Sequence, residues 1–411
     1  MVALAVSGFA ADGSRTETEA QYQSALAACG NCPALASILN KLGGLYYAAG
    51  RYYEARPVYE RALALREAEA GAESPELLPS LNNLALLFRE TADYGRARGF
   101  AERARAIAES QSRAESTDGA TVYANLGAIA QMQGETAEAR QWLGRALSIR
   151  EGLLGPAHPL VAETLNDLAL AYRLEGRFQT AAELYRRALA ILEAAPDARN
   201  RNLAAVLNNL GKMEAQEGHF KEAEQILRRS VAESERRFGP QHPNTALSLV
   251  SLAEVLRSRH RYHEAEAALD RAEEIDRRNL APDHPQIARD LSLEGALAFD
   301  RKKYSEAESA FERSVAILRQ HSPAPNRELG KATANLAEVY FREKRLAAAA
   351  DAYDKALTIL EQTMGKDNLD LVPTMEQYAL VLRARQDFAK AAGLDARAMK
   401  IRVTRTLRGA S

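Results

Sequence analysis

The chain has 411 residues, of which 46% are hydrophobic and 27% charged, and its formal net charge is −1. This balance lacks the clustered basic excess that nucleic acids and anionic membranes attract, so it argues against either as the main partner. Alanine, leucine, glutamate and arginine are abundant and no segment alternates like a strand, which predicts an all-α protein.

The N-terminal segment, residues 1–15, contains a short apolar run at positions 2–11 that ends in small residues. The run is similar to the end of a secretory signal, but no Lys or Arg precedes it and it is too short to span a membrane. Localisation therefore stays open between the cytoplasm, which is the default expectation, and export if the run is the remnant of a signal. No transmembrane segment is predicted elsewhere.

Residues 16–32 are expected to form a capping helix and a joint that holds both cysteines of the chain, Cys29 and Cys32. A thiol redox centre needs its first cysteine at a helix N-terminus after a strand, and a zinc site needs two more ligands; neither is found here. The pair is thus expected to be two free thiols in a reducing compartment or a disulfide in an oxidising one. A thiol-redox function remains as a disfavoured alternative.

From residue 33 to the C-terminus the chain repeats itself every 42 residues. Each unit contains two segments with apolar residues at helical spacing on either side of a tight turn, as around Gly176. Small residues at fixed places let the two helices approach closely, and the pairs must stack because one pair cannot bury its apolar face alone. One such register consists of Ala55, Ala97, Ala139, Ala181, Ala223, Ala265, Ala307, Ala349 and Ala391.

This pattern resembles the tetratricopeptide repeat. The long unit, the loops GPAHP (155–159), GPQHP (239–243) and APDHP (281–285), and first helices such as LNNLA (81–85) are similar to its kinesin-light-chain-like branch. The resemblance implies a right-handed superhelical solenoid of about nine helix-turn-helix repeats over residues 33–411. It also implies a scaffold or adaptor for a protein or peptide partner, with no prediction of oligomeric state.

In the resembled family, asparagines on the concave wall of the first helices hold the main chain of an extended peptide. Asparagine is a poor residue for a helix interior, so its recurrence there requires a reason, and its amide both donates and accepts hydrogen bonds. The alternative is that each asparagine bonds the adjacent first helix and fixes the stacking. The predicted groove residues are Asn82, Asn83, Asn125, Asn166, Asn208, Asn209 and Asn335, with Arg89, Arg173 and Arg257 about one turn further along.

The arginines predict an acidic-leaning ligand along residues 80–260, because guanidinium groups bind carboxylates well. A solvated face is an equal alternative for any single arginine. Phe299 and Phe341 are expected to offer apolar contacts further along the chain. An alternative function is a sensor or regulatory subunit that controls a separate effector enzyme.

No catalytic residue, cofactor or metal site is predicted. Most histidines fall in turns or loops, and His260 and His263 lack a third ligand fixed by helix spacing. The sequence has no glycine-rich phosphate loop, nucleophile elbow or H-E-x-x-H motif, and the repeats leave no room for a separate catalytic domain.

Overall fold

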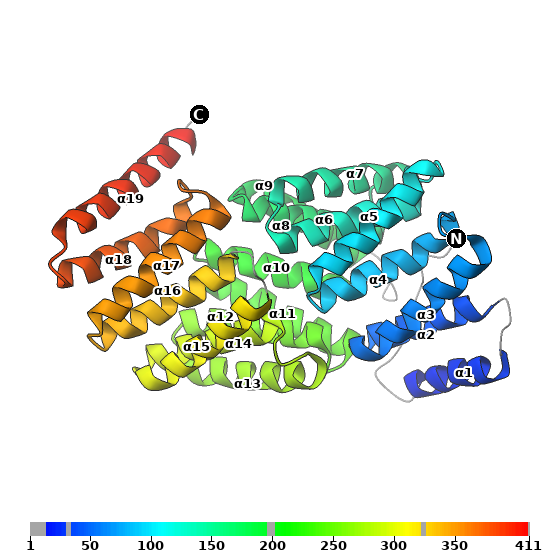
Figure 1. Ribbon diagram of the computed structural model, residues 1–411, viewed down its shortest axis with the longest axis horizontal. Coiled ribbons are helices and arrows are strands. Elements are labelled where there is room, and N and C mark those ends of the chain that lie inside the picture. Colours follow the sequence, from blue (N-terminus) through cyan, green and yellow to red (C-terminus); the bar gives the residue numbers. More distant parts are fainter. Residues whose placement is uncertain (1–13, 30–33, 195–201, 322–325, 410–411) are drawn as a thin grey trace. The chain divides into compact units, whose positions relative to one another are not determined.

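The computed structural model describes residues 14–29, 34–194, 202–321 and 326–409. These residues form 19 α-helices and two short 3-10 helices, with no β-strand among them (Figure 1). The helices pack as pairs, which confirms the all-α repeat fold. They divide into two compact units, residues 1–261 (unit 1) and 262–411 (unit 2).

The first described helix of unit 1 is α1 (Ser14–Cys29), which lies where the capping helix is expected and contacts α2. Five helix pairs and a last single helix follow. They are α2 (Leu35–Ala48) with α3 (Tyr52–Ala70), α4 (Leu78–Glu90) with α5 (Tyr94–Ser110), α6 (Thr117–Gln133) with α7 (Thr136–Leu154), α8 (Pro159–Leu174) with α9 (Phe178–Ala194), α10 (Leu203–Gln216) with α11 (Phe220–Phe238), and α12 (Pro243–Ser258). The 3-10 helix η1 (Pro75–Leu77) precedes α4.

Unit 2 continues the same pattern. It consists of α13 (Tyr262–Asn279), then α14 (Pro285–Asp300) with α15 (Tyr304–His321), α16 (Arg327–Arg342) with α17 (Leu346–Met364), η3 (Leu369–Leu371), and α18 (Val372–Ala384) with α19 (Phe388–Gly409). Helix α13 also contacts α14. The first helices of both units are shorter than most of the second helices that follow them.

The small-residue register explains how closely each pair packs. All nine alanines of the register that begins at Ala55 are buried, with at most 1% of their surface exposed. Gly127 on α6 lies so close to α7 that an added Cβ would be 2.5 Å from the Leu143 Cγ atom. The close approach predicted for the two helices of a repeat is therefore confirmed.

Several inter-repeat loops cap the α-helix or 3-10 helix that follows them with a side chain. In the three His-Pro loops the imidazole Nδ1 accepts a hydrogen bond from the backbone N–H two residues on, at 3.0–3.1 Å, and proline takes the first helical position. Other loops use hydroxyl or amide oxygens in the same role. The capping histidines are His158, His242 and His284, and the other caps are Ser74, Ser116, Asn326 and Asn368.

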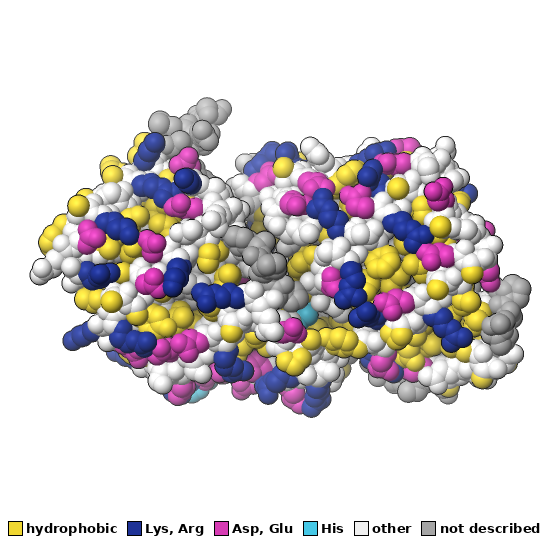
Figure 2. Space-filling model, in the orientation of Figure 1, with side chains coloured by type: hydrophobic (Ala, Val, Ile, Leu, Met, Phe, Trp, Pro, Cys, Tyr) yellow, Lys and Arg dark blue, Asp and Glu magenta, His cyan; other side chains and the backbone are white. Residues whose placement is uncertain are grey.

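Many surface charges are paired between consecutive second helices. Arg187 Nη2 lies 2.6 Å from Glu151 Oε1, and Arg229 Nη1 lies 2.8 Å from Glu193 Oε1. On the face shown in Figure 2, basic and acidic side chains are interspersed rather than separated by sign. Each exposed pair contributes at most about 1 kcal/mol, so these pairs assist a stack that the buried alanines and leucines hold together.

Candidate functional site

The first helices of unit 1 form a continuous surface, which we call the inner wall. Each of these helices contacts the next one, from α2 through α4, α6, α8 and α10 to α12. Consecutive second helices pack together less closely and are bridged by long side chains. The first helices of unit 1 are therefore packed against one another more tightly than its second helices are.

Four of the predicted asparagines bond one first helix to the next. Asn125 Nδ2 donates to Asn82 Oδ1 at 3.2 Å, which joins α6 to α4. Asn209 Nδ2 donates to Asn166 Oδ1 at 3.0 Å, which joins α10 to α8. This is the arrangement that the stacking interpretation expects. These four side chains therefore help to fix the stack, and their contact with a ligand stays a prediction.

The remaining asparagines have other environments. Asn83 on α4 is half-buried and Asn335 on α16 of unit 2 is exposed, and among the described residues neither makes a side-chain hydrogen bond. Asn208 is 4% exposed, and its Oδ1 atom finds no donor in the described part of the chain. A buried carbonyl oxygen without a donor is costly, so Asn208 retains an unused acceptor.

The predicted arginines are engaged within the protein. Arg89 Nη2 lies 2.7 Å from Glu90 Oε1 on its own helix. Arg173 Nη1 donates to Gln216 Oε1 at 2.8 Å. Arg257 is half-buried in the last turn of α12. The Glu90 carboxylate already offsets the charge of Arg89. The structure therefore weakens the expectation of an acidic ligand, which was based on the spacing of the arginines.

Asp167 on α8 occupies the same register of the inner wall as Asn83, Asn125 and Asn209. Its carboxylate accepts a hydrogen bond from Asn166 Nδ2 at 3.1 Å. Burial raises the pKa of Asp167 to about 6, although its side chain keeps some exposure to solvent. The sequence analysis did not select this residue; the available signal was an acid in a row of amides.

Two neighbouring groups modify the charge of Asp167. Glu163, one turn earlier on α8, raises the pKa of Asp167 further, whereas the charge of Arg89 opposes the shift. Asp167 therefore combines a raised pKa with partial access to solvent.

The aromatic residues predicted as apolar contacts belong to unit 2. The Phe299 ring lies 5.6 Å from the Tyr304 ring in an edge-on arrangement, and the Arg342 guanidinium is 5.7 Å from the Phe299 centroid. Phe341 is half-buried and packs against the core of the last repeats. Both phenylalanines are therefore part of the packing of unit 2, and their contact with a ligand stays a prediction.

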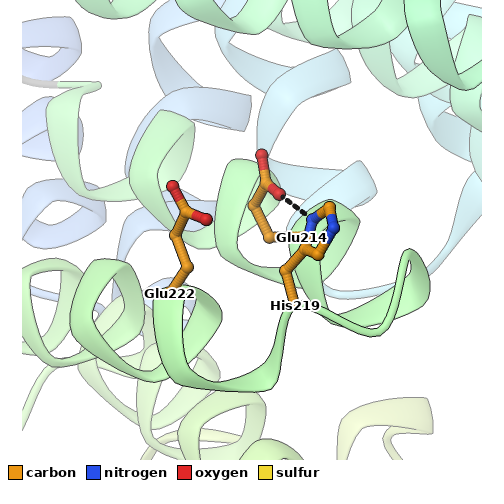
Figure 3. A group of neighbouring side chains, drawn as sticks. All are labelled: Glu214, His219 and Glu222. Atoms are coloured by element: carbon orange, nitrogen blue, oxygen red, sulfur yellow. Dashed lines mark hydrogen bonds and ion pairs between the residues drawn. The ribbon is translucent and has the colours of Figure 1, made fainter.

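Among the described residues, one group of side chains is close enough to share a metal ion: Glu214, His219 and Glu222 (Figure 3). His219 Nδ1 forms a hydrogen bond with Glu214 Oε2 at 2.9 Å, and this bond raises the pKa of His219. Arg186 Nη2 lies 3.9 Å from the other oxygen of Glu214. The buried acid already has cationic partners and the other two side chains are exposed, so we assign no ion to this group.

The cysteine pair cannot be placed. Cys29 is the last residue of α1, and Cys32 lies outside the described residues. The expected disulfide or thiol pair therefore stays a prediction, as does the signal-like run at positions 2–11, which also lies outside them. Within the described ranges no helix combines the length and apolar composition needed to cross a membrane.

A repeating stack of helix pairs with a row of polar side chains along its first helices defines a repeat scaffold of the kind that binds other proteins or peptides. The chain belongs to the tetratricopeptide repeat family, whose model matches residues 34–110, 119–194, 202–277, 246–320 and 329–402. The predicted membership of this family is thereby confirmed. No curated protein sequence matches the chain significantly.

Solved structures of similar fold include both kinesin-light-chain-like repeats and bacterial regulators. The apo form of the quorum sensor NprR from B. thuringiensis is 17% identical, with 84% of this chain and 94% of that chain covered and a TM-score of 0.56. A Rap protein complexed with Competence and Sporulation Factor is 14% identical, with 80% and 99% covered and a TM-score of 0.55. A putative kinesin light chain from Podosopora anserina is 24% identical, with 50% and 97% covered and a TM-score of 0.38. At these identities the likeness to the first two structures shows the fold alone.

Proposed function

We propose that the chain is an interaction scaffold that binds an extended segment of a partner protein along the inner wall of unit 1. The observation that carries this proposal is the row formed by Asn83, Asn125, Asp167 and Asn209 at one register of successive first helices. Polar side chains repeated along successive first helices can meet the main chain of an extended peptide at successive residues.

Stacking and peptide binding are compatible uses of the same asparagines. Asn125 and Asn209 each donate one hydrogen bond from Nδ2 to the previous first helix, and the Oδ1 atom of each remains available as an acceptor. Asn83 keeps both its donor and its acceptor. The wall can therefore supply hydrogen bonds to a peptide without breaking the bonds between its own helices.

The ligand in this proposal is not required to be acidic. Arg89 is paired with Glu90, and Glu163 and Asp167 add two negative charges to the same wall. Such a wall supports a ligand of mixed charge better than a purely acidic one.

The proposal is tested with peptides selected from a random library on the full-length protein. Binding of the selected peptides should weaken about five- to tenfold in Asn83→Ala, because one peptide hydrogen bond is lost. Glu183→Ala is the control, since Glu183 is exposed on the second helix α9 and is not one of the predicted groove residues. Peptides whose affinity is indifferent to Asn83→Ala and to Asn125→Ala would contradict the inner wall as the binding surface.

The regulatory subunit expected as an alternative would use the same surface but alter the activity of its partner. The two uses differ in one measurement. An effector enzyme bound through the inner wall should change its turnover when the scaffold is added, and Asn83→Ala should abolish that change. A partner that binds without any change in turnover supports the simple adaptor.

A further inference from the structure

The last repeat of unit 2 exposes large apolar side chains on a face that no other described helix covers. We call this face, formed by α18 and α19, the end face (Figure 1). Ala398 and Ile401 on α19 are buried, so α19 is packed firmly against its own repeat and only its other side is open. The end face consists of Leu380, Phe388, Met399 and Val403, which are between 44% and 68% exposed.

In earlier repeats the register of Met399 is buried beneath the next first helix. The residues 42 and 84 positions before Met399 are Leu357 and Val315, and both are at most 8% exposed. Leu357 on α17 belongs to one apolar cluster with Val372 of α18, and Val315 on α15 belongs to another with Leu329 of α16. The end face therefore continues the kind of surface on which a first helix packs elsewhere in the chain.

Val403 makes this register apolar where every earlier repeat is charged. The residues at steps of 42 before Val403 are six glutamates and two arginines. The glutamates of this register that form an ion pair with an arginine of the next second helix include Glu151, Glu193 and Glu361. A terminal repeat that faces only water needs a polar outer face, so a valine at this position favours association.

The charge of the last helix pair indicates what kind of partner fits. The segment from α18 to α19 contains eight basic and three acidic residues, although the formal net charge of the whole chain is −1. Two of its acids are already paired, since Glu376 Oε1 lies 2.8 Å from Arg402 Nη2 and Asp395 forms an ion pair with Arg383. Arg385, in the turn between the helices, is exposed and forms no ion pair with a described residue. Two end faces would therefore repel each other, whereas acidic side chains would be attracted.

We propose that the end face binds an amphipathic helix of a partner protein, apolar on one side and flanked by glutamate or aspartate, in the manner in which α18 packs on α17. The apolar side of the guest helix covers Met399 and Val403 and removes them from water. Its acidic flanks complement the basic excess of α18 and α19. This surface lies in unit 2, so the inference does not depend on binding along the inner wall of unit 1.

The experiment selects helical peptides on the full-length protein from a display library. Apolar residues are fixed at helical spacing, and the other positions are drawn from Glu, Lys and Gln, so we expect the selected peptides to be enriched in Glu over Lys. Val403→Glu, which restores the residue found at Glu361, and Met399→Glu should each weaken these peptides about tenfold or more. Leu153→Glu is the matched control, since Leu153 is an exposed apolar residue on the second helix α7, and it should change nothing.

Three other outcomes would overturn the inference. Selected peptides that are rich in Lys, or that bind equally to Val403→Glu and Met399→Glu, would contradict an acidic helix on the end face. Dimerisation in sedimentation velocity that Val403→Glu abolishes would assign the end face to a second copy of the chain. Binding to vesicles that contain phosphatidylserine, lost in Val403→Glu and without any helix binding, would assign it to anionic lipid.

Discussion

Two buried carboxyl groups between α13 and α14 should make unit 2 less stable as the pH rises. Asp276 and Asp290 are each 1% exposed, and the Oδ2 atoms of both have no donor among the described residues. The two groups lie within hydrogen-bonding reach of each other, so one of them must carry a proton to satisfy the pair. The other oxygen of Asp290 accepts a hydrogen bond from Gln286 Nε2 at 3.1 Å.

The direction of the effect follows from the pKa values. Burial raises the pKa of Asp276 from 3.8 to about 7, and burial together with the Asp276 charge raises the pKa of Asp290 well above its usual value. Glu273 adds to both shifts and Arg289 opposes them. The folded state thus binds a proton more tightly than the unfolded chain. The stabilisation is complete below about pH 4 and is lost as the pH rises through about 7.

The size of the effect follows from the same shift. Moving one carboxyl pKa from 3.8 to about 7 corresponds to about 4 kcal/mol of stability between low and high pH. The pair is almost fully buried, so solvent screening removes little of this energy. Between pH 5 and pH 8 we expect the free energy of unfolding to fall by about 2–3 kcal/mol because of the Asp276 shift.

Amide hydrogen exchange of peptides from α13 and α14, corrected for intrinsic rates, measures this change in the full-length protein. Trp142 is the single tryptophan and lies in unit 1, so its fluorescence gives an internal reference. Asp290→Asn should remove most of the pH dependence, because an amide donates to Asp276 without a titrating proton. The same slope in wild type and Asp290→Asn would refute the reasoning.

A second variant can replace the carboxyl pair by the apolar contact found in the next repeat. The equivalent positions one repeat later are Leu318 and Ala332, which pack in one apolar cluster. The double change Asp276→Leu with Asp290→Ala copies that contact and should make exchange in α13 and α14 independent of pH between 5 and 8. Asp283→Asn in the exposed loop between them is the control and should leave the slope unchanged.

Two further predictions concern the packing of single repeats. His284→Ala should lower the free energy of unfolding by about 0.5–2 kcal/mol in urea titrations because α14 loses its cap, while His284→Asn, which keeps an acceptor, should lose less; equal losses would contradict the capping role. Gly127→Ala should lower the free energy of unfolding by about 1–3 kcal/mol, because the added Cβ meets Leu143. Gly144→Ala on α7, with nothing within 4 Å, should leave the free energy of unfolding unchanged or raise it by up to about 1 kcal/mol. A loss of stability in both variants would contradict the role of the Gly127–Leu143 contact.

The fold could be predicted because its signal recurs in every repeat. The 42-residue period located the helix pairs, and the turn predicted around Gly176 has a positive φ of 76° at that glycine. A register of small residues predicts close helix contact whatever the details of each repeat. The division into two compact units was not predicted, because the period passes through residues 261 and 262 without a break.

The candidate site was harder to predict because its interactions do not follow the period. Asn125 bonds Asn82, 43 residues away, so an asparagine in one register meets an asparagine in the neighbouring one. Counting residues within one register therefore could not distinguish stacking from ligand binding. The capping by His158 was also missed, since the usual capping residues are Ser, Thr, Asp and Asn.

The pKa is raised for three aspartic acids of this repeat protein, Asp167, Asp276 and Asp290, and their surroundings decide what each can do. Asp276 and Asp290 face each other between two packed helices, where only a proton can relieve the charge. Asp167 lies on the inner wall with partial access to water, so solvent can offset part of its charge. The first arrangement should therefore make the stability of unit 2 depend on pH, whereas the second places a carboxyl that titrates near pH 6 on the inner wall.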